Sequence, residues 1–168
     1  MSNNKSFVVK NGISAKRYLG SNGTETAGSS LSIPSMTLTG STFSVASQDS
    51  NPQGIALKPD GTKFFIIGNS TNAVYEYVMS TAFTLSTASY NSVSFSFSSQ
   101  TTNIRDCAVS ANGFNLYVLS ATGTAVYQYT LSTAWDLSTA SYSGNSFTFS
   151  EDTGPVGLSI SSSGDYLY

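Results

Sequence analysis

The chain has no histidine and a single cysteine, Cys107, among its 168 residues. A Ser-His-Asp triad cannot form without histidine, and an intrachain disulfide needs a second cysteine. Zinc sites built from cysteine and histidine are excluded for the same reason. The sequence therefore lacks the residue types of many hydrolases and of the common structural metal sites.

Charged residues are scarce as well, at 10% of the chain, where about a quarter is usual. Among the basic residues only Lys10, Lys16 and Arg17 come close together. Counterion-driven binding of nucleic acid needs clustered lysine and arginine, so nucleic acid is not an expected partner. No apolar run reaches the length of a membrane span, and no secretory-type apolar stretch follows the initial methionine. We expect a protein made and folded in a cytoplasm, without membrane insertion.

Serine and threonine take the place of the missing charges, and the chain is rich in aromatic residues, with ten tyrosines and ten phenylalanines. These large side chains bury enough surface to offset the entropy lost on folding, which argues against a disordered linker. The composition is typical of an extracellular or virion β-protein whose surface is solubilised by hydroxyl groups.

The sequence repeats itself with a period of about 52 residues. When residues 51–102 are placed above residues 103–154, about 21 of about 52 positions are identical without a gap. The strongest match is Ser-Thr-Ala-Phe-Thr-Leu-Ser-Thr-Ala-Ser-Tyr at 80–90, which returns at 132–142 with tryptophan and aspartate in place of phenylalanine and threonine. Repeats of strand-forming residues with a period of this length are typical of a β-propeller, in which each repeat is one four-stranded blade.

Four strands are expected in each repeat, and the fold class is all-β. In the first repeat the expected strands cover residues 54–58, 63–68, 73–79 and 92–98. A turn of Pro59, Asp60 and Gly61 separates the first two, because these residues favour the backbone angles of a tight turn. Residues 63–68 are almost continuously apolar, as in a strand buried on both faces. Residues 92–98 instead alternate with period two, as in a half-buried strand.

The ends of the repeated region indicate an incomplete propeller. Residues 43–48 match residues 95–100 at the same offset, so we expect a lone outer strand within 41–50, of the kind that closes a propeller ring. Residues 155–168 begin a third unit and stop inside its second strand. The expected domain is thus a closing strand, two blades and half of a third, within 41–168. We expect a longer native chain, and assembly of partial propellers from several chains is the alternative.

Residues 1–40 do not fit the repeat and form an N-terminal extension. They hold a short apolar stretch with an Asn-Gly turn signal, followed by a Gly/Ser/Thr-rich stretch of linker composition at 21–30. One interpretation is a disordered leader with a stray strand. The other is an attachment segment that pairs with another protein, or with copies of itself, by strand addition. The residues of this attachment segment are Phe7, Val8, Val9, Lys10, Asn11, Gly12 and Ile13.

Two stretches carry a resemblance to a known family. The sequence Phe-Val-Val-Lys-Asn-Gly-Ile at 7–13 resembles the opening of many tailed-phage tail-fibre and virion structural proteins, notably of marine and cyanobacterial phages. Lys-Pro-Asp-Gly-Thr-Lys at 58–63, with the Ser-Thr-Ala block at 80–90, is similar to propeller repeats of such phage proteins and of bacterial secreted proteins. The second repeat departs from this pattern, with Ser-Ala-Asn-Gly at 110–113, yet Asn-Gly still supports a tight turn.

This resemblance implies a location in the phage tail of the virion, after synthesis in the host cytoplasm. It also implies attachment to other virion or tail proteins through the N-terminus, and a distal surface that recognises a host glycan or receptor. Fibre proteins are usually trimers, so a homotrimer is expected. We therefore predict a tail-fibre-like or receptor-binding virion protein that is not an enzyme and uses no cofactor. The alternatives are a lactonase-type propeller enzyme and a secreted bacterial adhesion or scaffold propeller.

The carboxylates show no catalytic pairing. Asp49, Glu151 and Asp152 lie in loops after outer strands, and two glycosidase carboxylates must face each other across a substrate, so we expect solvated loop charge. A lactonase-type propeller binds a divalent metal in its central channel, where Asp106 and Asn103 are the candidate ligands. We expect no catalytic and no metal site.

Cysteine and aromatic residues have mainly structural interpretations. Cys107 takes the place that Ile55 has in the first repeat, so we expect a small buried side chain rather than a nucleophile. The tyrosines that recur at equivalent positions are expected to pack between blades; they are Tyr75, Tyr77, Tyr127 and Tyr129. Phe83 and Trp135 are expected to fill the gap between adjacent blades. Trp135 is also the candidate for contact with a glycan.

Overall fold

The computed structural model describes residues 7–8, 14–15, 42–161 and 164–168. The chain divides into two compact units, Met1–Thr39 and Gly40–Tyr168. In the first unit, strand β1 (Phe7–Val8) pairs antiparallel with strand β2 (Ser14–Ala15). Phe7 lies opposite Ala15 and Val8 lies opposite Ser14.

Most of the predicted attachment segment and linker lies outside the described residues. Phe7 and Val8 form β1, whereas Val9, Lys10, Asn11, Gly12 and Ile13 are among the residues that are not described. The linker predicted at 21–30 is not described either, so both remain sequence predictions.

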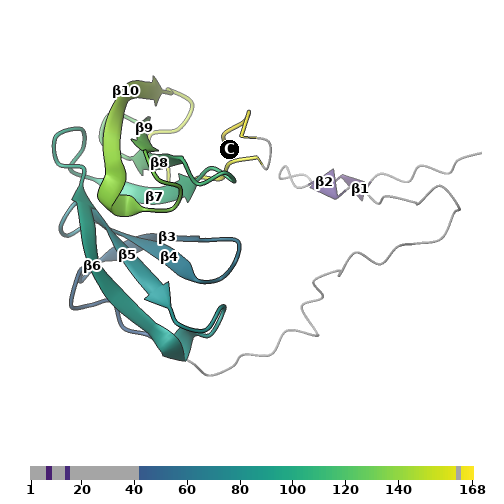
Figure 1. Ribbon diagram of the computed structural model, residues 1–168. Helices are drawn as coiled ribbons and strands as arrows, with labels where there is room; N and C mark the ends of the chain where they lie inside the picture. Colours follow the sequence, from purple (N-terminus) through teal and green to yellow (C-terminus); the bar gives the residue numbers. More distant parts are fainter. Residues whose placement is uncertain (1–6, 9–13, 16–41, 162–163) are drawn as a thin grey trace, which may run out of the picture. The chain divides into compact units, whose positions relative to one another are not determined.

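The second unit consists of two four-stranded antiparallel sheets, each with its strands in chain order (Figure 1). The first sheet contains β3 (Pro52–Leu57), β4 (Lys63–Gly68), β5 (Ala73–Met79) and β6 (Ala88–Ser96). The second sheet contains β7 (Ile104–Val109), β8 (Asn115–Ser120), β9 (Ala125–Leu131) and β10 (Ala140–Thr148). A single-turn 3-10 helix precedes the last strand of each sheet, and these are η2 (Leu85–Thr87) and η3 (Leu137–Thr139). The prediction of an all-β fold is confirmed.

Strands β3 to β5 follow the predicted pattern closely, and β4 and β5 begin and end where the sequence placed them. Every residue of β4 after Lys63 is buried, as expected for a strand covered on both faces. In the turn before it, Gly61 has a φ of +70° and its N–H donates to the Lys58 carbonyl at 2.9 Å. Hydrogen bonds from Lys58 and Thr62 lower the pKa of the exposed Asp60 to about 2.

The last strand of the first sheet starts earlier than predicted. The sequence placed it at 92–98, but β6 begins at Ala88, which lies opposite Met79. The end of the Ser-Thr-Ala block therefore pairs with β5 instead of forming a connection. A register shift follows Tyr90, and Ser92 there has a φ of 58°. Alternation cannot reveal a strand that continues through such a bulge, because the bulge shifts the alternation by one residue.

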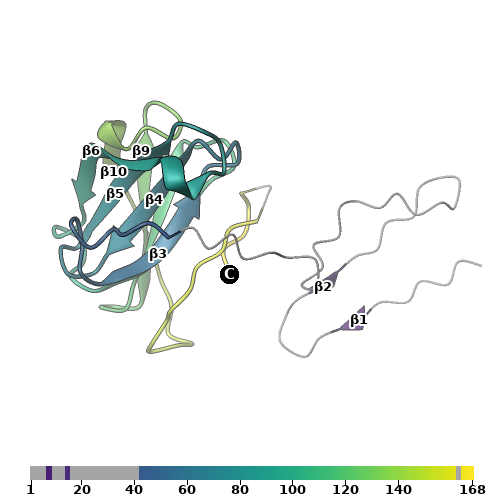
Figure 2. The same ribbon diagram turned by 90° about the horizontal axis from the view of Figure 1, so that it is seen from below.

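The two sheets pack face to face, with their first strands β3 and β7 side by side (Figures 1 and 2). Gly54 of β3 lies so close to Asp106 of β7 that a side chain at position 54 would meet the carboxylate and the backbone of Asp106. Both strands carry a register shift just before this point. The absence of a side chain at Gly54 thus permits the close approach of the two sheets.

One hydrophobic core spans both sheets. From the first sheet and the loop after it come Ala56, Phe65, Ile67, Val74 and Phe97. From the second sheet and the connection between β9 and β10 come Ile104, Cys107, Val109, Leu116, Val118, Tyr129, Leu131, Trp135 and Leu137. A smaller cluster covers the other face of the first sheet. It contains Phe64, Ile66, Tyr77 and Met79, with Phe43 and Val45 packed against it.

The lone outer strand expected within 41–50 is not formed. Residues 42–45 have no strand partner, and residues 46–48 form a turn. A strand needs a neighbouring strand edge for its backbone hydrogen bonds, and no such edge lies beside this segment in the described part of the chain. Phe43 instead packs edge-on against Tyr77, with ring centroids 5.6 Å apart.

The third unit expected at 155–168 forms one isolated β-bridge, between Ile160 and Leu167. Ser159 and Tyr168 exchange backbone hydrogen bonds of 2.9 and 2.8 Å beside it. Within residues 42–161 and 164–168 the sheets close into neither a barrel nor a ring. Where the chain is described, no helix is long and apolar enough to cross a membrane.

Candidate functional site

Each Ser-Thr-Ala block begins with a loop that folds back onto the tight turn between the first two strands of its own sheet. We call residues 80–87 the first loop and residues 132–139 the second loop. The N–H of Phe83 donates to the Gly61 carbonyl at 2.8 Å, and the N–H of Trp135 donates to the Gly113 carbonyl at 2.9 Å. Each aromatic ring lies against the glycine, where a Cβ atom would collide with it.

Both aromatic residues have a backbone conformation that is unusual for large side chains. Phe83 has a φ of 56° and Trp135 a φ of 58°, in the left-handed region that bulky residues rarely occupy. Such a conformation persists only when the surrounding contacts hold it in place. The glycine turn therefore sets the direction in which each loop presents its aromatic ring.

The second loop is seated on the first sheet. The Trp135 ring packs against Phe65 of β4, with centroids 5.7 Å apart, and is only 7% exposed. Leu137, two residues further on, is 1% exposed and belongs to the core shared by the sheets. Trp135 thus fills a gap between the sheets, as predicted. The indole of Trp135, the candidate for contact with a glycan, is covered among the described residues.

A charged pair on the first sheet holds the backbone of the second loop. The Lys63 ammonium lies 2.7 Å from the Glu76 carboxylate and donates to the Trp135 carbonyl, also at 2.7 Å. The Asn91 side-chain amide donates to the same oxygen of Glu76, Oε1, at 2.6 Å. The second oxygen of Glu76, Oε2, accepts the Leu137 N–H at 2.9 Å. Glu76 is 1% exposed. A buried carboxylate is tolerated here because three donors satisfy it.

The second sheet carries a neutral version of this pair at the corresponding positions. Asn115 of β8 corresponds to Lys63, and Gln128 of β9 corresponds to Glu76, each at the same place in its strand. The Gln128 amide donates to the Asn115 side-chain oxygen at 2.9 Å, and Asn145 donates to Gln128 at 3.3 Å. Asn115 and Gln128 are half-buried. Their side-chain amides are neutral and can both donate and accept hydrogen bonds, whereas the charged Lys63 only donates and the charged Glu76 only accepts.

A small pocket of about 130 Å³ lies over Gln128, one member of this neutral pair. Its walls are residues of β8, β9 and β10 together with one residue of the C-terminal segment, namely Tyr117, Val126, Gln128, Asn145, Ser146, Phe147 and Leu167. Tyr117 and Phe147 stand where Phe65 and Phe95 stand on the first sheet. This pocket therefore occupies the place on the second sheet that the second loop covers on the first. We call this surface the acceptor groove.

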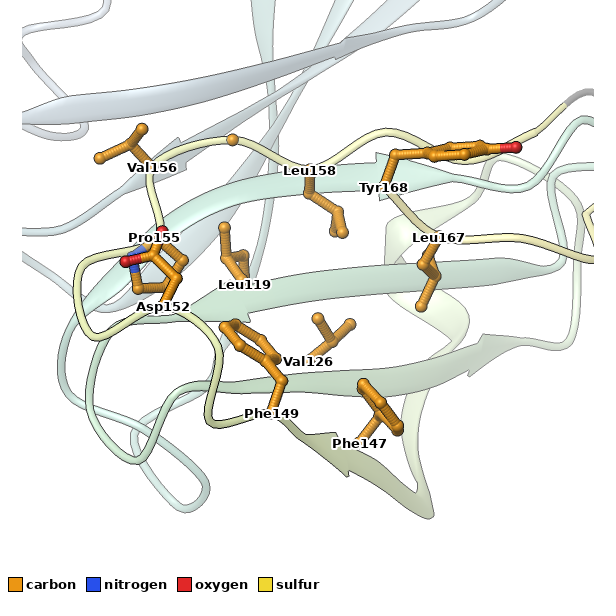
Figure 3. Close-up of a pocket in the computed structure, with 11 residues that line it drawn as sticks. Leu119, Val126, Phe147, Phe149, Asp152, Pro155, Val156, Leu158, Leu167 and Tyr168 are labelled. Atoms are coloured by element: carbon orange, nitrogen blue, oxygen red, sulfur yellow. The ribbon is translucent and has the colours of Figure 1, made fainter. Parts of the chain in front are cut away.

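A larger apolar pocket of about 360 Å³ adjoins the acceptor groove and shares Val126, Phe147 and Leu167 with it. It lies between the second sheet and the C-terminal segment. Figure 3 shows Leu158 and Leu167 pointing from that segment toward Val126 and Phe147 on the sheet. Asp152 is the single charged residue in its lining, so the pocket suits an apolar occupant.

Among the residues that the structure describes, no sheet packs against the first loop, whereas the second loop packs on the first sheet. Phe83 is 65% exposed, although its backbone is held against Gly61 as Trp135 is held against Gly113. The expectation that Phe83 fills a gap between blades is therefore not met by the described residues. Within the described part of the chain, one aromatic loop packs on a sheet and the other is exposed.

Asp49 is buried, contrary to the expectation of solvated charge, at 2% exposed. Its carboxylate accepts hydrogen bonds from the N–H groups of Asn51, Ser70 and Thr71 and from the Thr71 hydroxyl, the latter at 2.7 Å. Burial on its own raises the pKa of Asp49, but the hydrogen bonds from Thr71, Asn51 and Ser70 outweigh it and hold this pKa below the ordinary value. Asp49 thus fastens the segment before β3 to the loop after β4.

Of the other carboxylates named above, Glu151 and Asp152 are neighbours in one loop, and Asp106 lies in β7. Glu151 and Asp152 are exposed, as predicted. The Asp106 carboxylate accepts the N–H groups of Cys107 and Leu158 at 2.8 and 2.9 Å, so it joins β7 to the C-terminal segment. Among the described residues, no group of three or more Cys, Asp or Glu is placed to hold a metal ion.

Cys107 and Tyr129 are packing residues of the core. Cys107 is buried in the shared core, and burial, with a smaller contribution from Asp106, raises the pKa of its thiol well above the usual range. Tyr129 packs against Phe95 of the first sheet, as expected for a tyrosine between the sheets. Its hydroxyl donates to Gln100 at 3.1 Å, and the Tyr77 hydroxyl donates to Gln48 at the same distance.

The sequence alone did not single out the residues that hold the second loop. Lys63 and Glu76 are polar residues within otherwise apolar strands, and Asn115 and Gln128 are polar at the matching positions of the repeat. The recurrence of polar residues at the same two strand positions of both repeats was the sequence feature that could have indicated these residues. A polar residue repeated within a buried strand indicates a specific hydrogen-bond partner, because an unpaired polar group there is costly.

Comparison with known proteins adds no assignment. No protein-family model matches the chain, and no curated protein sequence matches it significantly.

Proposed function

We propose that the protein is a structural component of a phage virion, tail-fibre-like or receptor-binding, that attaches by its N-terminus and presents a β-propeller for recognition of the host surface. The observation that carries the proposal is the resemblance of residues 7–13 and of the Ser-Thr-Ala blocks to tailed-phage virion proteins. Its partners are other tail proteins and a host glycan or receptor, and the fibre is a homotrimer.

The propeller part of the proposal, with blades of about 52 residues, is supported by the geometry of the second unit. Both sheets are four-stranded meanders, and their first strands lie side by side. These are the traits of neighbouring propeller blades around an axis. The hydroxyl contacts of Tyr77 with Gln48 and of Tyr129 with Gln100 also occur once in each sheet. An electron-microscopy reconstruction of the protein tests this part, and an open sandwich without a central axis would contradict it.

The virion role is tested on purified phage particles from the host in which the gene is expressed. We expect peptides of this protein in the mass spectrum of gradient-purified particles and gold-labelled antibody at the tail. An antibody against a capsid protein serves as the positive control, and lysate lacking particles serves as the negative one. Absence of the protein from particles that retain their tails would reject the role.

The attachment segment is tested by binding. A variant with Val8→Asp and Ile13→Asp places charges in the apolar stretch that strand addition would use. We expect the variant to fold normally in its second unit yet to be missing from particles. Thr24→Asp combined with Ser29→Asp, in the predicted linker, adds two aspartates outside the attachment segment and is the matched control.

A further inference from the structure

An amine and a side-chain amide meet at one carboxylate oxygen of Glu76. The Lys63 Nζ lies 2.7 Å from Oε1 of Glu76, and the Asn91 side-chain amide donates to that same oxygen at 2.6 Å. An amine can displace ammonia from a carboxamide when a carboxyl group beside both carries the protons. We propose that Lys63 and Asn91 form an isopeptide bond, with Glu76 as the acid and base of the reaction. This proposal goes beyond the virion role and does not rest on it.

The first sheet brings the three groups together from three neighbouring strands. Lys63 lies at the start of β4, and Glu76 lies in β5, the strand between β4 and β6. Asn91 lies in the bulge of β6, between Tyr90 and Val93, which pair with successive residues of β5. A bulge can redirect a side chain, and here the Asn91 side chain reaches Glu76. Residues of β4 and β6 therefore meet at a carboxylate of the strand between them.

The second loop encloses the amine and the carboxylate. Glu76 is 1% exposed and the Lys63 side chain 19% exposed. The Trp135 carbonyl accepts from Lys63, and the Leu137 N–H donates to the other oxygen of Glu76, so both side chains are held in place. Burial of two charges costs more than burial of a neutral amine and a neutral carboxylic acid, which favours proton transfer within the pair. Asn91 is exposed, so released ammonia can leave to solvent.

The reaction moves the acyl group of Asn91 from one nitrogen to another. A proton first passes from Nζ of Lys63 to Glu76, which leaves a neutral amine with a free electron pair. This amine attacks the side-chain carbonyl carbon of Asn91 and forms the new C–N bond. Glu76 then gives its proton to the departing nitrogen and takes one from Nζ. The old C–N bond breaks, and its electron pair leaves with ammonia, so nothing is oxidised or reduced.

The second sheet lacks all three groups. Asn115, Gln128 and Ser143 stand at the corresponding positions of the repeat, and they include neither an amine nor a carboxylate. A four-stranded sheet with the same strand order forms there all the same. The amine, the carboxylate and the amide are therefore not required for a sheet of this kind, and they occur together in one repeat. The bond would tie β4 covalently to β6 across β5.

The experiment is a measurement of the intact mass of the purified full chain after incubation near neutral pH. We expect a mass that is lower than the mass of the sequence by one ammonia. Chymotrypsin cuts after aromatic residues, several of which lie between Lys63 and Asn91. The two residues therefore separate on digestion of an unlinked chain, and a branched peptide that contains both locates the bond.

Variants test each group in turn. Lys63→Arg keeps the positive charge beside Glu76 but removes the amine nucleophile. Asn91→Ser introduces the residue that the second repeat has, and Glu76→Gln removes the proton carrier at nearly constant size. Each of the three is expected to show the full mass. Asn145→Ser removes the asparagine that donates to Gln128 in the second sheet, and this matched control is expected to keep the loss of ammonia. Circular dichroism of each variant confirms that the sheets are intact.

Three results would overturn the proposal or part of it. A folded natural chain that keeps its full mass after prolonged incubation rejects the bond. A loss of ammonia that persists in Lys63→Arg and in Asn91→Ser also rejects it, because the ammonia then comes from another asparagine. A branched peptide that still forms in Glu76→Gln rejects the role of Glu76. None of these results bears on whether the protein is found in phage particles, so the two proposals fail separately.

Discussion

Glu76 and Gln128 occupy the same place in two related sheets, yet their surroundings differ. Glu76 is enclosed by Lys63, Asn91 and the backbone of the second loop, whereas Gln128 lines an open pocket. Charge is present where the site is covered, and neutral amides are present where it is open. The covered carboxylate depends on its donors, because an ion without partners in a protein interior is strongly destabilising.

Replacement of Glu76 by alanine is expected to lower the free energy of unfolding by about 3 kcal/mol, because Lys63 then stays largely buried without a counter-charge. The matched control is Gln128→Ala, which is expected to cost less than about 1 kcal/mol because the site is open to water. The double variant Lys63→Asn with Glu76→Gln copies the neutral pair and is expected to recover most of the loss. Urea denaturation of the three variants measures these differences, and equal losses for Glu76→Ala and Gln128→Ala would contradict the account.

Asp49 makes stability depend on pH. Its pKa in the folded protein lies below the ordinary value of 3.8. The stabilisation is therefore fully present above the unfolded-state pKa and is lost as the pH falls through the folded-state pKa. We expect Asp49→Asn to be less stable than the natural chain near neutral pH, and the two to converge under acidic conditions. Urea midpoints measured across the acidic range test this, with Thr102→Asn, at an exposed position without a titratable group, as the control.

At the scale of the elements, each hairpin turn and the loop above it form one structural part. Gly61 and Gly113 have φ values of +70° and +79°, and each supports an aromatic ring where a side chain would otherwise stand. The turn residues and the Ser-Thr-Ala blocks were recognisable in the sequence because they recur together. Their contact was not predictable, because it depends on a left-handed aromatic residue that turn propensities do not anticipate.

Alanine at the two glycine turns is expected to have unequal effects. Both substitutions strain a left-handed backbone, at a cost of roughly 1 kcal/mol. At Gly61 the new methyl group pushes against Phe83, whose exposed ring can move into solvent. At Gly113 it pushes against Trp135, which is confined by Phe65. We expect Gly113→Ala to be the more destabilising by about 1 to 3 kcal/mol, and thermal unfolding that ranks the two variants the other way would refute this explanation.

At the scale of the whole molecule, the two sheets share one core, and the seat of the second loop belongs to it. Trp135 is the single tryptophan of the chain and lies at the junction of the sheets. Its fluorescence therefore reports on the packing of one sheet against the other, while far-ultraviolet circular dichroism reports on the strands themselves.

We expect these two signals to follow the same transition during urea unfolding, because neither sheet keeps its apolar face covered without the other. Phe83→Trp in a Trp135→Phe background moves the reporter to the open loop and serves as the control, with a smaller change in emission wavelength on unfolding. A Trp135 transition that precedes the loss of strand signal would show that the sheets separate before they unfold.

The sequence by itself determined the all-β class, the second and third strands of the first sheet, and the tight turns, because apolar patterning and turn chemistry are local properties. It did not determine the length of the last strands, because bulges interrupt the alternation that would mark them. Only the tertiary structure decided that the segment before β3 forms a turn, that Asp49 is buried, and that Trp135 is covered while Phe83 is exposed. The two aromatic residues stand at equivalent positions of one repeat. What separates them is whether a sheet lies against the loop, and that depends on the packing of distant segments.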